Sequence, residues 1–178
     1  PRTQIPTLLF AQARGSREVH HTATLVKTGN GDIVPEMIRS CIQHGTMESV
    51  TCPCFFPDSD AQRRYERADC YVLPSVSEPF GISVLEAMTS GCPTIVSKTT
   101  GVGEALKHVL RAEHWDSDEM ADQLLYVLTN RPLREAIGTN GTLAVRKFTW
   151  EATGRNTRDA TELAVDGVTP HAVGESAA

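Results

Sequence analysis

The sequence lacks a run of lysine or arginine that would mark a basic patch, and its formal net charge is −5. A general nucleic-acid binder carries a basic patch, so we expect no nucleic-acid partner. No apolar stretch approaches the length of a transmembrane helix, and no segment has the pattern of a signal peptide. We therefore expect a cytoplasmic protein without a transmembrane segment, while a peripheral association with a membrane surface stays open.

A disulfide framework is also missing, because the five cysteines show no regular spacing. An odd number of cysteines is typical of reduced thiols in the cytosol. Cys52 and Cys54 are too close together for the usual C-x-x-C metal or redox motif, and no second pair completes a zinc site. The six histidines have no ligand spacing either. We predict that the protein binds no metal.

The length of 178 residues, with 40% apolar and 22% charged residues, suits one globular domain with its own core. Short apolar runs alternate with amphipathic helical patterns, which predicts an α/β fold: a Rossmann-like parallel sheet flanked by helices, with a helical C-terminal end. We assign residues 1–165 to this domain. Residues 166–178 are rich in Gly, Pro and Ala and are predicted to be a disordered tail.

The order of the predicted elements follows from these patterns. The expected strands cover residues 22–26, 49–52, 70–74, 93–96 and 109–110. The expected helices cover residues 33–44, 58–67, 82–90, 117–128, 132–148 and 150–165, with a single helical turn at 104–107. Ser117 is the expected N-cap of its helix.

The most informative part of the chain is a strand, loop, helix and strand near its middle. Residues 70–74 form an apolar run with β-branched and aromatic side chains, which predicts a buried parallel strand. Residues 82–90 have apolar positions at helical spacing, Gly91 is placed to end that helix, and 93–96 is the next apolar run. Such a βαβ unit places ligands at the carboxyl ends of its strands.

Two carboxylates flank the start of this helix. Glu78 lies in the loop before it and Glu86 lies about one turn inside it. Gly81 allows a ligand to approach the backbone, and the free amides of Gly81, Ile82 and Ser83 would carry partial positive charge that suits a phosphate or diphosphate. Glu86 could then accept hydrogen bonds from a ribose diol, and Glu78 could bind the hydroxyls of a sugar beyond the phosphates.

Residues 68–97 resemble the donor-site signature of glycosyltransferase family 4, also called group 1. The hallmark of that family is a pair of glutamates with seven residues between them, as in Glu78-Pro-Phe-Gly-Ile-Ser-Val-Leu-Glu86. An Ala-Met-x-x-Gly-x-Pro pattern follows, and the resemblance extends from about Leu8 to Leu163. It implies the C-terminal half of a GT-B enzyme, a retaining transferase that moves a hexosyl group from a nucleoside-diphosphate sugar to an acceptor.

The resemblance also implies which residues bind the donor. These are Cys54, Phe55, Glu78, Pro79, Phe80, Gly81, Ile82, Ser83 and Glu86, with Glu78 as the candidate catalytic residue. In the family, the loop after the second strand contacts the nucleotide base and usually has glycine where this chain has Cys54, so the base contacts stay open. Phe55 could stack on the base or pack in the core. No cofactor is expected besides the donor substrate.

A GT-B enzyme holds its acceptor mainly in a first Rossmann-like domain. We therefore expect that the sugar or glycan acceptor binds a missing N-terminal domain, and that the isolated chain transfers nothing. The family places an Arg and a Lys on the diphosphate from a segment upstream of Pro1. Lys98 is the best remaining cation, although a solvated lysine is the alternative. Ser97, Thr99 and Thr100 either bond phosphate oxygens or simply form a turn.

Several alternative interpretations stay open. Ser83 and Glu86 also fit a capping box, which needs no ligand. Trp115 and Trp150 are interpreted as helix-packing anchors, with sugar platforms as the alternative. The chain could also be a sugar-nucleotide epimerase or a glycan phosphorylase of the same architecture, or a non-catalytic regulatory or assembly module.

Overall fold

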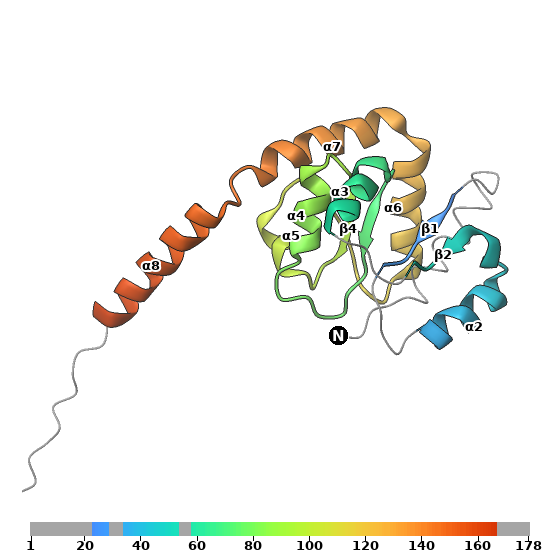
Figure 1. The fold of residues 1–178 in the computed structure, drawn as a ribbon, viewed down its shortest axis with the longest axis horizontal. Coiled ribbons are helices and arrows are strands. Elements are labelled where there is room, and N and C mark those ends of the chain that lie inside the picture. Colours follow the sequence, from blue (N-terminus) through green and yellow to red (C-terminus); the bar gives the residue numbers. More distant parts are fainter. Residues whose placement is uncertain (1–22, 29–33, 54–57, 167–178) are drawn as a thin grey trace, which may run out of the picture. The chain divides into compact units, whose positions relative to one another are not determined.

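The computed structural model describes residues 23–28, 34–53 and 58–166 (Figure 1). The chain divides into two compact units, Pro1–Val145 and Arg146–Ala178. Within the described ranges, no helix combines the length and the apolar character that a membrane span requires. The predicted limits of the domain, residues 1–165, stay a prediction, and residues 167–178 of the predicted tail lie outside the described residues.

The strands of the first unit form two parallel ladders. Strand β1 (Leu25–Val26) pairs with β2 (Val50–Thr51). Strands β3 (Tyr71–Leu73), β4 (Thr94–Ser97) and β5 (Leu110–Ala112) pair in the order β3-β4-β5. All of these pairs are parallel, so the carboxyl ends of β3, β4 and β5 lie at one edge of their sheet.

Helices separate the strands along the chain, as the sequence predicts. In the first unit they are α2 (Val34–His44), the short 3-10 helix η1 (Met47–Ser49), α3 (Asp58–Arg67), α4 (Ile82–Thr89), α5 (Gly101–Ala105), α6 (Ser117–Thr129) and α7 (Arg131–Val145). The second unit contains α8 (Trp150–Asp166). The prediction of an α/β fold with a parallel sheet flanked by helices is confirmed.

Two helix starts differ from the prediction. Helix α5 begins at Gly101, earlier than the helical turn expected at 104–107. Ser117 is not the N-cap of α6, because the Asp116 side chain takes that place and its Oδ1 accepts a hydrogen bond from the Glu119 amide at 2.8 Å. A carboxylate in this position satisfies a free amide and also interacts favourably with the helix dipole.

The β3-β4-β5 sheet is covered on both faces. Ile95 of β4 belongs to a buried cluster that includes Met120 and Leu124 of α6. The next residue, Val96, points the other way and packs against Gly103 of α5. Tyr71, which shares the face of Val96 by the register of the strands, bonds to α4. Helices α4 and α5 therefore cover one face and α6 the other, as the position of β4 between α4 and α6 in Figure 1 shows.

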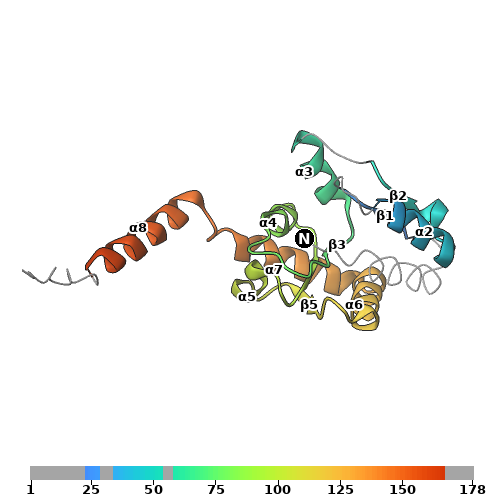
Figure 2. The same ribbon diagram turned by 90° about the horizontal axis from the view of Figure 1, so that it is seen from below.

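Helix α7 closes the first unit by packing against both α4 and α6 (Figure 2). Gly91 adopts a positive φ of 77° and ends the helical segment before β4, as predicted. A Cβ atom at Gly138 of α7 would overlap the backbone oxygen of Gly91. The Thr142 hydroxyl donates a hydrogen bond to the Met88 carbonyl at 3.0 Å. Contact between α7 and the end of α4 thus depends on the absence of a side chain at residue 138.

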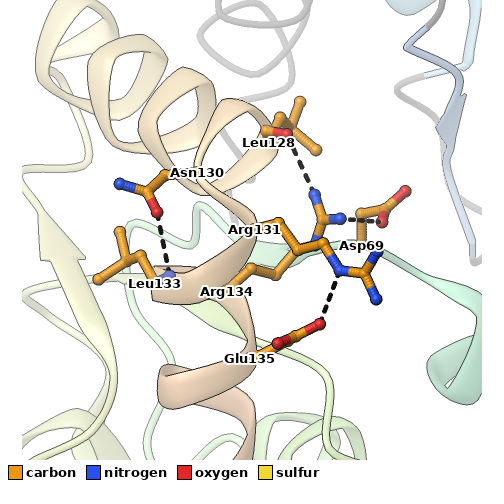
Figure 3. A network of polar contacts seen from close by, with 7 residues as sticks. All are labelled: Asp69, Leu128, Asn130, Arg131, Leu133, Arg134 and Glu135. Atoms are coloured by element: carbon orange, nitrogen blue, oxygen red, sulfur yellow. Dashed lines mark hydrogen bonds and ion pairs between the residues drawn. The ribbon is translucent and has the colours of Figure 1, made fainter.

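A polar network fixes the turn between α6 and α7 (Figure 3). The Arg134 guanidinium donates to the Leu128 carbonyl at 3.0 Å and lies 3.5 Å from the Asp69 carboxylate. The Asn130 side chain accepts a hydrogen bond from the Leu133 amide at 3.1 Å and so caps α7. A cation near the last carbonyls of a helix is favourable, and this one also ties α6 and α7 to the turn before β3.

The contact of Gly138 with Gly91 gives a stability prediction. Alanine normally stabilises a helix interior relative to glycine, but Gly138→Ala places a methyl group against backbone and should lower the free energy of unfolding by about 1–3 kcal/mol. Gly154→Ala is the control, because a Cβ there meets nothing within 4 Å. Urea denaturation measures both variants. Unchanged stability of Gly138→Ala would contradict the close contact.

Candidate functional site

The loop between β3 and α4 is joined to the start of α5 by backbone hydrogen bonds. Glu78 forms an isolated parallel bridge with Thr100, and the Gly101 amide donates to the Glu78 carbonyl at 3.0 Å. The Val102 amide donates to the Phe80 carbonyl at 2.8 Å. The backbone of Glu78 is therefore held in place at the carboxyl edge of the sheet, while its half-buried side chain accepts a hydrogen bond from the Phe80 amide at 3.4 Å.

Buried hydroxyls join the same loop to the end of β4. The Ser97 hydroxyl donates to the Ser75 carbonyl and lies 3.0 Å from the Thr100 hydroxyl. The Thr99 hydroxyl also donates to Ser75, at 3.0 Å. Ser97 and Thr100 are fully buried, so these hydroxyls hold the two loops together. This arrangement favours the turn-forming interpretation of Ser97, Thr99 and Thr100 over direct contact with a phosphate.

Helix α4 begins at a glycine with a left-handed backbone, and the first amides of the helix are unpaired. Gly81 has a φ of 97°, and its carbonyl accepts a hydrogen bond from the Val84 amide at 3.0 Å. Among the residues that the structure describes, the amides of Gly81, Ile82 and Ser83 have no acceptor. Three donors at a helix start suit an anion. The space beside Gly81 that a side chain would take is filled by Thr100 and Val102.

The capping-box interpretation of Ser83 and Glu86 is wrong. Gly81 occupies the N-cap position, and no side chain caps α4. Ser83 lies inside the helix, where its hydroxyl accepts a hydrogen bond from the Tyr71 hydroxyl at 2.8 Å. The positive φ of Gly81 explains this start, because an L-residue with a side chain rarely adopts it.

Tyr65 and Tyr71 support the exposed face of α4, and the sequence analysis did not identify them. The Tyr65 hydroxyl donates to the exposed Glu86 carboxylate at 3.4 Å, and the two tyrosine rings meet edge to face at 5.5 Å. Burial raises the pKa of both phenols, so both stay protonated and donate. One signal was available in the sequence, because Tyr65 is the only aromatic residue of the otherwise polar α3.

The other predicted donor-site residues are exposed on the surface or lie outside the described residues. Phe80 and Ile82 are exposed beside the unpaired amides, at 45% and 57%. Pro79 is also exposed, and its carbonyl lies against Gly101. Cys54 and Phe55 lie outside the described residues.

The structure also locates Lys98 and the groups that could bind a metal. The Lys98 ammonium lies 3.2 Å from the Glu113 carboxylate, which follows β5, so this cation is paired at the end of β5. The described residues contain no group of three or more His, Cys, Asp or Glu side chains that could hold a metal ion. Burial raises the pKa of the Cys92 thiol to about 12, so this sulfur is neutral at ordinary pH.

The interpretation of the tryptophans as packing anchors is wrong. Trp115 is 64% exposed and Trp150 is 83% exposed. Side chains with this much contact with water bury little area against their neighbours.

Comparison with known families decides the class of the protein. The family described as "Glycosyl transferases group 1" matches residues 3–144. The chain belongs to this family. The α/β fold is therefore that of a glycosyltransferase domain. Glu78 and Glu86 lie on either side of the start of α4 within this domain.

Curated relatives agree with this assignment. The chain is 32% identical over 151 residues to an uncharacterised glycosyltransferase of Methanocaldococcus jannaschii, which covers 82% of this chain and 38% of the relative. It is 29% identical over 153 residues to the O-antigen chain mannosyltransferase B of Escherichia coli, covering 85% of this chain and 40% of that protein. The chain thus spans about two fifths of the length of these relatives.

Solved structures show the same fold. Sucrose-phosphate synthase of Thermosynechococcus elongatus matches 93% of this chain and 43% of its own chain, with a TM-score of 0.77 and 24% identity. The C-terminal domain of the group 1 glycosyltransferase LpcC from Francisella tularensis matches 80% of this chain and 77% of its own, with a TM-score of 0.70 and 26% identity. Anabaena HepE in complex with UDP and glucose matches 89% of this chain and 44% of its own, with a TM-score of 0.71 and 19% identity.

The raised pKa values of Tyr65 and Tyr71 predict a loss of stability at alkaline pH. The folded protein holds each phenolic proton more tightly than the unfolded chain, in which tyrosine ionises near pH 10. The stabilising contribution is therefore present below about pH 10 and is lost as the pH rises further. Urea denaturation between about pH 9 and 11 should show that the free energy of unfolding falls less steeply with pH for Tyr65→Phe than for the unmodified chain. Equal slopes would contradict the burial of the Tyr65 phenol.

Proposed function

We propose that this chain is the donor-binding part of a retaining glycosyltransferase of family 4. In the complete enzyme, a hexosyl group passes from a nucleoside-diphosphate sugar to a sugar or glycan acceptor. The observation that carries the proposal is the set of unpaired amides at the start of α4, between Glu78 and Glu86, in a chain of the group 1 family.

The diphosphate would bind at the start of α4. Its negative charge is attracted by the partial positive charge of the helix N-terminus, and the amides of Gly81, Ile82 and Ser83 can donate to its oxygens. Fixed donors at this position would also stabilise the charge that develops on the departing nucleoside diphosphate. The amides need no rearrangement for this task, because Gly81 and the backbone bonds of the loop already hold them.

The two glutamates would bind the groups on either side of the diphosphate. Glu86 would accept hydrogen bonds from the ribose diol, and a carboxylate has enough lone pairs to keep its bond from Tyr65 at the same time. Glu78 would bind the hydroxyls of the transferred sugar and position its anomeric carbon. In the transfer, the bond between that carbon and the diphosphate oxygen would break, and the acceptor oxygen would form a new bond to the carbon. The proton of the acceptor hydroxyl would pass to the departing diphosphate.

The acceptor would bind outside this chain, in an N-terminal domain. Support comes from the curated relatives, of which the chain spans about two fifths. The same proposal places the enzyme in the cytoplasm, with no cofactor besides the donor substrate and no bound metal. Alone, the chain would bind the donor without transferring its sugar. UDP is the first nucleotide to test, because HepE of Anabaena was solved with UDP and glucose.

The site is tested by calorimetry with UDP, GDP and ADP. We expect one of them to bind, and we expect Glu86→Ala to weaken that binding at least about tenfold because the ribose loses its acceptor. Glu162→Ala, which removes an exposed carboxylate of α8, is the control. Addition of EDTA should leave the affinity for the nucleotide unchanged. If no nucleotide binds at millimolar concentration, a non-catalytic module is the better explanation.

The role of Glu78 is tested in a longer protein that includes an N-terminal domain. Glu78→Gln keeps the backbone bonds of residue 78 and removes the negative charge, so kcat should fall at least about tenfold while the affinity for the nucleoside diphosphate changes little. NMR of the product should show an anomeric configuration equal to that of the donor. An inverted product would exclude the retaining mechanism, and an unchanged kcat would remove Glu78 from the transfer step.

A further inference from the structure

The face of α4 that carries Glu86 contacts two tyrosines from neighbouring elements. Tyr65 belongs to α3 and Tyr71 to β3. The Tyr65 hydroxyl donates to the Glu86 carboxylate at 3.4 Å, and the Tyr71 hydroxyl donates to the Ser83 hydroxyl at 2.8 Å. Ser83 and Glu86 have the i, i+3 spacing that places two side chains on one face of a helix. Both phenols therefore bond to the same face of α4.

The Tyr65 side chain is held by its ring as well as by its hydroxyl. Its ring meets the Tyr71 ring edge to face, with the centroids 5.5 Å apart and an interplanar angle of 87°. This geometry is favourable for two aromatic rings. Tyr71 is itself bonded to α4 through Ser83, and α3 packs against α4. The Tyr65 hydroxyl therefore has a defined position beside Glu86.

The Glu86 carboxylate has little else to define its position. It is exposed, and among the described residues Tyr65 is the one side chain that donates a hydrogen bond to it. A glutamate that moves freely between rotamers loses conformational entropy when a ligand immobilises it. A hydrogen bond that already restricts the carboxylate before the ligand binds reduces this loss.

The bond from Tyr65 leaves Glu86 able to accept further hydrogen bonds. Burial raises the pKa of the Tyr65 phenol, so the hydroxyl stays protonated and donates at ordinary pH. At 3.4 Å the contact is longer than a strong O–H···O bond, so it does not compete strongly with a ligand. A carboxylate has about four acceptor positions, and the phenol uses one of them, on Oε2. Two vicinal hydroxyls of a ligand can therefore both donate to Glu86.

We propose that Tyr65 is a positioning residue, which orients Glu86 to accept from both ribose hydroxyls and thereby favours ribonucleotides over 2′-deoxyribonucleotides. This inference rests on the proposed function, because that function assigns the ribose to Glu86. It extends the donor site to a residue of α3 that has no contact with the diphosphate in this assignment. A nucleotide without the 2′-hydroxyl would leave one of the oriented acceptor positions without its partner.

Calorimetry tests the inference on the unmodified chain and on Tyr65→Phe, with UDP, GDP and ADP each compared with its 2′-deoxy counterpart. We expect the unmodified chain to bind the preferred ribonucleotide at least about tenfold more tightly than the deoxy form. Tyr65→Phe should reduce this ratio at least about threefold, mainly by weakening the binding of the ribonucleotide. A residue with a purely structural role would weaken the binding of both forms alike, and an unchanged ratio would therefore overturn the inference.

A double substitution tests whether Tyr65 acts through Glu86. In the Glu86→Ala background, Tyr65→Phe should change the Kd of the ribonucleotide less than about twofold, because the phenol has no carboxylate to orient. Additive effects of the two substitutions would contradict the proposed role. Tyr126→Phe is the matched control, since it removes the hydroxyl of a tyrosine of α6 that is 58% exposed. This variant should bind like the unmodified chain, and urea denaturation should show that all variants fold.

The outcomes separate this inference from the function on which it rests. If no nucleotide binds, or if Glu86→Ala binds as tightly as the unmodified chain, the ribose assignment and the role of Tyr65 are both wrong. If Glu86→Ala weakens binding while Tyr65→Phe keeps both the affinity and the preference of the unmodified chain, only the role of Tyr65 is wrong.

Discussion

The backbone pairing of Glu78 with Thr100 is the constraint on which the candidate site depends. It extends the parallel sheet beyond the ends of β3 and β4 and joins two loops that would otherwise be independent. Because the Gly101 amide bonds to Glu78 and the Val102 amide bonds to Phe80, the start of α5 supports the chain that leads into α4. The buried hydroxyl of Ser97 adds a hydrogen bond between the two loops by donating to the Ser75 carbonyl. The peptide groups proposed to bind a diphosphate are thus positioned by ordinary sheet hydrogen bonds.

Small residues make this pairing possible. A Cβ at Gly101 would overlap the carbonyl oxygen of Pro79, and a Cβ at Gly81 would come within 3.1 Å of the Thr100 side chain. The two loops can therefore approach one another only where glycine leaves room. Gly81 also needs its positive φ to direct the chain into α4, so this residue meets two requirements at once. The backbone of the site is closely packed, while side chains such as Glu86 stay exposed.

Much of the fold could be predicted from the sequence, since short apolar runs and helical spacing give the order of strands and helices. The end of the α4 segment at Gly91 could also be predicted, because glycine with a positive φ is a local signal. The start of α4 was predicted less well, since Ser83 and Glu86 fit a capping box that the observed start at Gly81 does not use. Tyr65 and Tyr71 were missed because their contacts join segments that are distant in sequence. The exposure of Trp115 depends on how its loop is bonded to α6, which composition does not reveal.

The pair of tyrosines has a mechanical consequence. Helix α3 contains few apolar residues, and the contacts of Tyr65 with the Tyr71 ring and with Glu86 attach it to the rest of the unit. Tyr71 in turn is bonded to Ser83 of α4. Helix α3, which follows β2, and helix α4, which follows β3, are therefore joined through two phenol groups.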